Sequence, residues 1–424
     1  MLRRLNAHAV LEFLRASGAV TATEVMAATG LSRPTVHTVC DGLIELGWVT
    51  EVEARRTAGA GQPGRPNRCY EFSARAGYVL GVDLGAASIQ VRLSDLRGDI
   101  VAEKAHLSGF TSISGRQRVQ WARRTIKSVL RAADVAPSAV LAAAVGVASP
   151  VDSDGRVYGG EHYLSGLTGE DLRKLIGRGY SWPVLLENDA NLAVLGERWH
   201  GVGEGVDNIV VLLAGERLGA GLFLGGQLLR GQMGGGGEMA FLRQVDCVGL
   251  PLVDTEGKTD GITRLARQLG REAVVLESHS LRTDTKTADV DSPTALFMLT
   301  GGDPERVDAE MVFSAARDGD SAAQQIVERI GDRIAKVIDI LATLLDPAMI
   351  VLAGAFAPST DVLLPVLKNR LTAYTDLNAY VREPPTVLVS VLGNHAVVLG
   401  ATRLALDHVE TETFERVTIT AAGR

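Results

Sequence analysis

The sequence predicts an α/β protein of two domains, an N-terminal helix-turn-helix with a wing and a two-lobed α/β body. Three observations lead to this prediction. Apolar residues recur at helical spacing over residues 21–46, buried-strand patterns begin at Tyr78, and a second series of strands and helices begins at Asn208. In addition, 424 residues are more than one hydrophobic core normally serves. We expect the domains to cover residues 1–75 and 76–424.

The N-terminal region has the pattern of a helix-turn-helix. A short helix is expected on the apolar residues Val25, Met26 and Ala28, and Gly30 ends it before a tight turn. Ser32 is of a type that caps helices, and the helix after it carries a regular apolar face made of Val36, Val39, Leu43 and Leu46. The opposite face of this second helix would be polar and exposed.

That polar face points to DNA recognition. A recognition helix in the major groove with a wing beside it is a DNA-reading arrangement. We therefore expect DNA contacts from four residues of the second helix, namely Arg33, Thr35, His37 and Thr38, with Asp41 on the same face. The alternative is a group of small helices that pack for stability alone.

A wing is predicted from two strands, Trp48–Val52 and Arg68–Phe72, and the loop between them. From Ala54 to Arg68 the chain has four arginines and no acidic residue, and Gly64-Arg65-Pro66 would hold a guanidinium forward on a stiff, narrow backbone. Such a shape suits the minor groove. We expect DNA contacts from Arg55, Arg56 and Arg65. A flexible linker with solvated arginines is the alternative.

The distribution of charge agrees with a DNA reader attached to an acidic body. The chain has a net charge of −7, whereas residues 1–72 contain eight arginines and seven carboxylates and so carry about +1. The remainder therefore carries about −8.

Cysteine content and hydropathy indicate the compartment. Cys40, Cys69 and Cys247 are too few and too far apart for a disulfide framework or a CxxC metal pair, which indicates a reducing cytosol. The longest uncharged apolar run, Ala139–Ala148, is too short to span a bilayer. We expect a cytoplasmic protein without a membrane partner, associated with the nucleoid when bound to DNA.

From Tyr78 the pattern is that of a two-lobed body. The first lobe is predicted to contain three strands, a helix and a fourth strand, at Val79–Asp83, Ile89–Leu93, Ile100–Ala105, Gly115–Ala133 and Val140–Val147. This order is typical of actin-like, hexokinase-like ATPases. The second lobe is predicted from strands at Asn208–Leu213, Gly221–Leu224 and Met349–Ala353, a helix at Ser321–Leu345, and a glycine-rich turn between the first two strands. We expect lobe one at about 76–190 plus a C-terminal helix at about 394–410, and lobe two at about 191–393.

Several motifs of the body together resemble the ROK family (repressors, open reading frames and kinases). Glu187-Asn188-Asp189-Ala190-Asn191 is similar to the family's ENDAN segment, and Asp346–Gly354 resembles its adenosine-side segment. Three glycine-rich stretches also follow the family pattern: Gly225–Leu228, Arg230-Gly231 and Gly236–Glu238. With the winged helix and its Gly-Arg-Pro wing, the resemblance covers nearly the whole chain and is to ROK transcriptional regulators of actinobacterial type.

The resemblance implies that Asp189 stands where family kinases have a general base, with Asn188 placed to hold a sugar hydroxyl. Phosphoryl transfer also needs an intact phosphate cradle. Here Asp83–Ala87 lacks the family's threonine, and Glu216 and Arg217 stand in the second glycine-rich turn, where a carboxylate opposes phosphate and a side chain blocks close backbone approach. We therefore expect Asp189 to be a degenerate kinase position, with no enzyme activity and no cofactor.

The family's zinc site is also incomplete. Phe241 stands at its histidine position, and only Cys247 lies nearby, whereas tetrahedral zinc needs four ligands. We expect no metal.

The family's sugar-contacting positions are partly kept. Asn188, Asp189 and Glu238 match them, while Tyr163 replaces an asparagine and Ala148-Ser149-Pro150 departs from Pro-Gly-Pro. We expect a sugar-like effector to bind in the inter-lobe cleft, because hinged clefts are favoured ligand sites. Its expected contacts are Asn188, Asp189, Glu238 and Tyr163. The alternative is that the two carboxylates only satisfy backbone groups there.

The sequence thus predicts a sequence-specific DNA-binding regulator, a repressor of carbohydrate-related genes. It would bind an inverted-repeat operator in double-stranded DNA as a homodimer or tetramer and respond to a sugar-like effector without kinase activity. Two alternatives stay open. One is a bifunctional sugar kinase and regulator, and the other is a DNA-binding protein with no effector.

Overall fold

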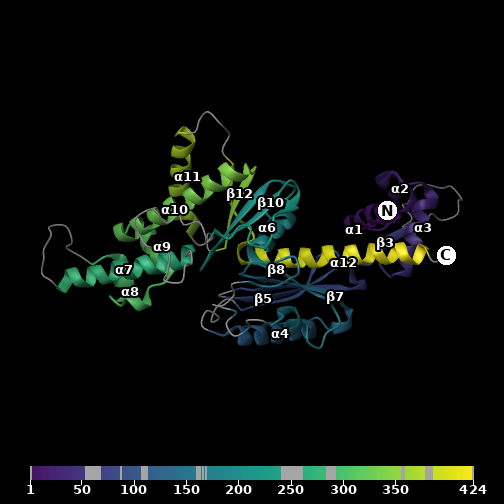
Figure 1. The fold of residues 1–424 in the computed structure, drawn as a ribbon, viewed down its shortest axis with the longest axis horizontal. Coiled ribbons are helices and arrows are strands. Elements are labelled where there is room, and N and C mark those ends of the chain that lie inside the picture. The colour runs from purple at the N-terminus through teal and green to yellow at the C-terminus, as the bar shows by residue number, and fades with distance from the viewer. Residues whose placement is uncertain are drawn as a thin grey trace, which may run out of the picture.

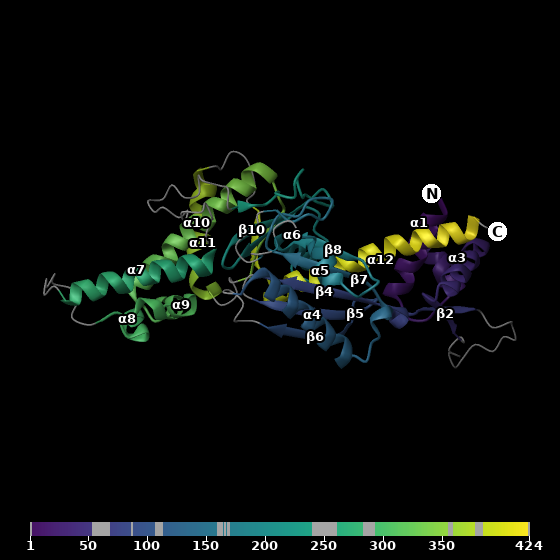
Figure 2. The ribbon, with the colours of Figure 1, turned by 60° about the horizontal axis from the view of Figure 1, so that its bottom comes forward.

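The winged helix, the two sheets of the body and a group of helices follow one another along the molecule (Figure 1). The winged helix lies at one end, and helices α7 (Ile262–Arg282) and α8 (Ala295–Thr300) lie at the other, in both views (Figures 1 and 2). The computed structural model describes residues 2–52, 68–85, 88–106, 113–158, 164, 167, 170–239, 261–282, 293–354, 359–377 and 385–422.

The N-terminal domain is a winged helix, as predicted. Its elements are α1 (Leu2–Ala16), β1 (Val20–Thr21), α2 (Ala22–Thr29), α3 (Arg33–Glu45), β2 (Val49–Val52) and β3 (Cys69–Phe72), and the strands form an antiparallel sheet in the order β1-β3-β2. A reciprocal Thr21–Glu24 capping box begins α2, and Gly30 ends it with a φ of 71°, which favours glycine. The core is formed by fully buried residues of all three helices and β3, among them Val10, Leu14, Val25, Val36, Leu43 and Tyr70.

The predicted N-cap residue of α3 is confirmed, but its side chain does not form a capping hydrogen bond. Ser32 occupies the N-cap position, but its side chain accepts no backbone hydrogen bond. Pro34, the second residue of the helix, has no N–H to offer, and the Ser32 hydroxyl lies 2.8 Å from that of Thr35 instead. The ring of Pro34 fixes its φ near the helical value, so Pro34 favours the start of the helix although no side chain caps it.

Lobe one is a five-stranded sheet with helices on both faces. It contains β4 (Tyr78–Leu84), β5 (Ile89–Asp95), β6 (Ile100–His106), α4 (Gly115–Ala132), β7 (Val140–Val147), α5 (Leu172–Gly177) and β8 (Val184–Asn188). The strand order is β6-β5-β4-β7-β8, with β4, β7 and β8 parallel and the others antiparallel. Helix α4 covers one face of this sheet, and the C-terminal helix covers the other (Figure 1).

Lobe two repeats this topology with the strand order β11-β10-β9-β12-β13. Its strands are β9 (Ile209–Ala214), β10 (Leu218–Leu224), β11 (Gln227–Leu228), β12 (Met349–Gly354) and β13 (Thr386–Val389). Its helices, besides α7 and α8, are α6 (Asp189–His200), α9 (Ala309–Arg317), α10 (Ser321–Leu345) and α11 (Thr360–Leu377). Two sheets of the same topology and a winged helix confirm the predicted fold class.

The turn between β9 and β10 is shorter than the glycine-rich turn that the sequence predicts. Strand β10 already begins at Leu218, because Leu218 and Ala220 are buried in the core of lobe two. Only residues 215–217 are left to form the connection, so Glu216 and Arg217 lie at its tip.

Helix α12 (Ala396–Ala422) is longer than predicted and joins the body to the winged helix. Its first half packs on β4, β7 and α6, and its second half lies beside α1 (Figure 1). The sequence predicts an end near residue 410, but Leu406 and Val409 are buried beside the winged helix, so packing there supports further turns. Among the described residues, no helix is both long and apolar enough to cross a membrane.

Candidate functional site

The recognition helix α3 presents part of the predicted DNA-contacting set to solvent. Arg33 and Thr38 are exposed, whereas Thr35 and His37 are half-buried. The Thr38 hydroxyl donates to the Pro34 carbonyl at 2.9 Å, and Nδ1 of His37 lies 2.7 Å from the buried Tyr70 hydroxyl on β3. His37 is thus oriented by the wing sheet, a contact that the spacing of α3 alone does not indicate.

The charge of Arg68, the wing arginine that the structure describes, has partners within the domain. Its guanidinium lies 2.8 Å from Asp41 on α3 and 2.7 Å from Glu51 on β2. The pair with Asp41 fastens the wing sheet to the recognition helix, and the pair with Glu51 connects β2 to the start of β3. The predicted contacts Arg55, Arg56 and Arg65 lie outside the described residues.

At the boundary between the two lobes, where the sequence predicts a ligand cleft, Asn188 acts first as a structural cap. Its Oδ1 accepts from the backbone N–H groups of Ala190 and Asn191, at 2.9 and 3.2 Å, which begins α6. Its Nδ2 donates to the Ser149 carbonyl at 3.2 Å and lies 3.5 Å from Oε1 of Glu238. The structure therefore brings Asn188, Asp189 and Glu238 together, while Tyr163 lies outside the described residues.

Three carboxyl groups influence one another in this cleft. Burial, followed by the nearby Glu238, raises the pKa of Asp189 to about 7. Burial, followed by Asp189, raises the pKa of Asp83 to about 8, and Asp83 accepts a hydrogen bond from Gln90 at 3.5 Å. Burial also raises the pKa of Glu238, and Arg217 opposes that shift. The sequence marks Asp83 only as part of the altered phosphate motif, so its place in this cluster is found from the structure.

Arg217 reaches from lobe two across the cleft to lobe one. Its Nη1 donates to the Ala148 carbonyl at 3.0 Å, and its Nη2 lies 3.7 Å from Oε2 of Glu238. Glu216 turns the other way and pairs with Arg267 through two contacts of 2.7 and 3.1 Å. The guanidinium of Arg217 therefore lies between the lobes, and the carboxylate of Glu216 is paired on the other side of the turn.

A second arginine also ties the lobes together. Nε of Arg230, just after β11, donates to Oε2 of Glu187 on β8 at 2.6 Å. The other oxygen of Glu187 accepts from the Asn188 backbone N–H and from Nδ2 of Asn191, both at 2.9 Å. Glu187 thus connects the loop of lobe two to the start of α6. The motif places Glu187 beside the site, but its partner across the cleft is not visible in the sequence.

The predicted absence of zinc concerns Phe241 and Cys247, which lie outside the described residues. Within the described ranges, no group of three or more His, Cys, Asp or Glu side chains is arranged to hold a metal ion.

Comparisons with known proteins place both domains. The ROK family model matches residues 79–247 and 289–408, and the MarR family model matches residues 3–58. A xylose repressor of Caldicellulosiruptor bescii is 21% identical over 96% of both chains. A glucokinase of Halalkalibacterium halodurans is 31% identical over 51% of this chain and 62% of its own, so less than two thirds of that kinase is spanned.

One solved structure has the same fold over almost the full length. It is that of a ROK family transcriptional regulator described as a homologue of the E. coli MLC protein. It has a TM-score of 0.71 at 20% identity and covers 99% of this chain and 98% of its own. The chain therefore belongs to the ROK family, and its N-terminal winged helix is similar to the MarR family model over residues 3–58.

Proposed function

We propose that this ROK protein is a sequence-specific transcriptional regulator, a repressor of carbohydrate-related genes, that responds to a sugar-like effector and lacks kinase activity. The observation that carries the proposal is Arg217 in the inter-lobe cleft of a body joined to a winged helix. A cleft of this kind is suited to bind a ligand and not to transfer a phosphoryl group, since phosphoryl transfer needs a cradle for the phosphates.

Asn188, Asp189 and Glu238, with Tyr163, are the residues proposed to bind the effector. Burial raises the pKa values of Asp189 and Glu238, which favours their protonated, uncharged form. A protonated carboxyl group can donate a hydrogen bond to a sugar hydroxyl and accept one from it, without the full cost of burying a charge. A phosphate group in the same place would meet three carboxyl groups, whose charges are only partly offset by the guanidinium groups of Arg217 and Arg118. These charges favour an uncharged sugar.

The names of relatives support both a regulator and a sugar kinase. Xylose repressors of two Caldicellulosiruptor strains match along 96% of this chain, winged helix included, while glucokinases match the body. A bifunctional kinase and regulator is therefore the second candidate. Glu216 and Arg217 weigh against it, because they stand where the resemblance places the threonine and glycine of the phosphate-contacting turn.

We propose that the regulator binds DNA as a homodimer, with a tetramer of two dimers as the larger form. One winged helix reads one half-site, and useful specificity generally takes two half-sites. Exposed apolar side chains on the helices of lobe two, far from the winged helix, support a two-fold contact there: Leu276 on α7 and Met298 and Leu299 on α8.

Two measurements test the proposal. Selection from a random pool of DNA duplexes should recover an inverted repeat, with a protein dimer in solution. Calorimetric titration with D-xylose, D-glucose, N-acetylglucosamine and their phosphates should find binding of an uncharged sugar. A single asymmetric half-site bound by a monomer would contradict the dimer. Failure of every sugar to bind would favour a DNA-binding protein without an effector.

A further inference from the structure

Helix α6 connects the cleft to the region beside the winged helix. It begins at Asp189, with Asn188 as its cap, and Trp199 lies in its last turn. Its 12 residues correspond to a length of about 18 Å. Helix α6 also touches α12 at backbone distance, since a Cβ on Gly400 would lie 1.7 Å from the Leu192 carbonyl oxygen. Helix α6 thus runs from Asn188 and Asp189 to Trp199 and lies against α12 on the way.

Trp199 contacts a turn that holds the end of α1. A Cβ on Gly98 would lie 2.4 Å from Cζ2 of Trp199, so the ring packs on the backbone of the β5–β6 turn. In the same turn, Arg97 donates to the backbone carbonyls of Arg15 and Ser17, the latter at 2.9 Å. Arg15 lies in the last turn of α1 and Ser17 directly follows the helix. Carbonyl groups at this end of a helix lack partners within the helix.

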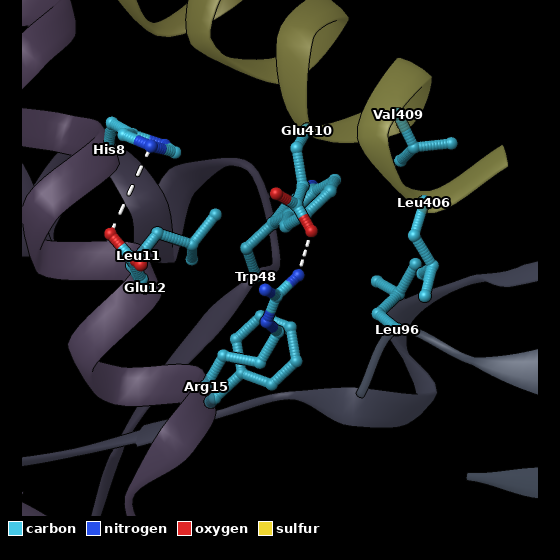
Figure 3. A pocket seen from close by; sticks show the side chains of 10 residues that line it. His8, Leu11, Glu12, Arg15, Trp48, Leu96, Leu406, Val409 and Glu410 are labelled. Atoms are coloured by element: carbon cyan, nitrogen blue, oxygen red, sulfur yellow. Dashed lines mark ion pairs between the residues drawn. The ribbon is translucent and has the colours of Figure 1, made fainter. Parts of the chain in front are cut away.

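On its other side, Trp199 meets an ion-pair cluster that also ends on α1. The guanidinium of Arg403 on α12 lies 5.8 Å from the centre of the Trp199 ring. Arg403 lies 3.8 Å from Glu410, and Glu410 pairs with Arg15 of α1 (Figure 3). Arg15 and Glu410 are both largely buried, with side-chain exposures of 21% and 13%. Removal of Glu410 would take from the buried guanidinium of Arg15 its direct ion-pair partner, and removal of Arg15 would leave Glu410 only the more distant Arg403.

The surface between α1 and α12 is closely packed around this ion pair. Leu406 and Val409 of α12 lie beside Leu11, Trp48 and Leu96, and the space left between them is about 10 Å³ (Figure 3). Helix α1 in turn packs on α2 and on the recognition helix α3.

We propose that Trp199 is a positioning residue that couples the cleft to the winged helix, through the Arg97 turn and the Arg403–Glu410–Arg15 ion pairs. The proposal rests on the proposed function, because it requires a ligand whose binding moves α6. The joint between α1 and α12 can nevertheless be tested without any ligand.

The first experiment examines the joint in the full chain, by hydrogen exchange of the α1 amides in Arg15→Glu, Glu410→Arg and the double variant. Each single charge reversal should speed exchange in α1, since opening of this contact exposes the helix, and the double variant should return most of the protection. Unchanged exchange in both single variants, or no recovery in the double variant, would overturn the joint.

The second experiment examines the coupling with Trp199→Leu, Trp199→Phe and the control Trp121→Leu, which alters a half-exposed tryptophan on α4. The readout is the ratio of operator affinities without and with the sugar that binds the wild type, D-xylose or D-glucose. Coupling of this type is typically about 5- to 150-fold. Trp199→Leu should bring the ratio close to one with unchanged sugar affinity, and the other two variants should keep it.

The outcomes separate the two proposals. A wild-type ratio in Trp199→Leu would overturn the coupling while leaving the proposed function intact. If neither sugar binds the wild type, the proposed effector and the coupling both fail for these sugars, whereas the exchange measurement still decides whether the joint exists.

Discussion

At the scale of single residues, the partners of arginines distinguish binding groups from structural ones. Arg68 belongs to the basic wing expected to contact DNA, but Asp41 and Glu51 hold its guanidinium. Arg217 belongs to the altered glycine-rich turn, and the Ala148 carbonyl and Glu238 hold its guanidinium. Sequence spacing predicts where such side chains begin. It does not predict which carboxylate or carbonyl from a distant segment meets them.

Arg65→Ala and Arg68→Ala should therefore have different effects on DNA binding. Arg65→Ala should weaken binding and lower the slope of log affinity against log salt by about one unit, because a phosphate contact and its released counterion are lost. Arg68→Ala should weaken binding but leave the slope almost unchanged, since its charge is already paired within the domain.

Fluorescence anisotropy at several salt concentrations measures both slopes. Arg306→Ala, which alters an exposed arginine in lobe two, serves as the control and should match the wild type. An unchanged slope in Arg65→Ala would exclude its proposed groove contact, and a lowered slope in Arg68→Ala would mean that DNA replaces the internal ion pairs.

The buried Asp83 should make stability depend on pH. Its pKa is about 8 in the folded chain, whereas an unfolded aspartate has a pKa of about 3.9. Between these values the folded state binds more protons than the unfolded state, so the free energy of unfolding falls as pH rises. Asp83→Asn removes this ionisation. Its melting temperature relative to wild type should therefore rise, by at least about 2 °C, between pH 6 and pH 9.

Thermal unfolding of both proteins at four pH values checks this expectation. Asp152→Asn, which changes a carboxylate on the lobe-one surface whose pKa is lowered by hydrogen bonds, should not show the same rise. A constant difference between wild type and Asp83→Asn across the pH range would show that Asp83 ionises freely in the folded chain.

At the scale of elements, periodicity and turn residues predict much of the fold. The helix at Ser321–Leu345 is found as predicted, and the predicted strands of lobe one differ from β4, β5, β6 and β7 by at most a residue or two at their ends. The end of α12 is missed because its extension depends on contacts with α1, more than 380 residues earlier in the chain. The lobe-two helices α7, α8 and α9 also go unpredicted.

Leu406→Ala tests whether α12 carries the winged helix. Leu406 is 1% exposed and lies between α12 and the winged helix, so its truncation should cost about 2–5 kcal/mol of stability at this interface. Differential scanning calorimetry should show the lowered transition, with Thr411→Ala on the exposed side of α12 as the control. Equal transitions in wild type and Leu406→Ala would mean that this contact contributes little.

At the scale of the whole molecule, we propose that a body with the fold of ROK kinases binds a ligand and does not transfer phosphoryl groups. Wild-type protein should show no ATP-dependent phosphorylation of glucose, N-acetylglucosamine or N-acetylmannosamine. The double variant Glu216→Thr, Arg217→Gly restores the family's glycine-rich turn and should gain measurable ATP binding, because it removes the opposing carboxylate and the obstructing side chain.

Turnover should stay absent in that double variant, since the first glycine segment still lacks its threonine. A coupled kinase assay and calorimetry with ATP measure the two properties. ATP turnover by the wild type that disappears in Asp189→Asn would favour the bifunctional kinase.

The most direct test of the central claim is operator affinity with and without the effector, for wild type and Asp189→Ala. A ligand shifts DNA affinity only by its different affinity for the two shapes of the protein, typically about 1–3 kcal/mol. The wild type should show this shift, and Glu204→Ala, an exposed carboxylate change, should keep it. Asp189→Ala should bind DNA nearly as well as wild type without effector but should not respond to it. An equal response in wild type and Asp189→Ala would contradict the account.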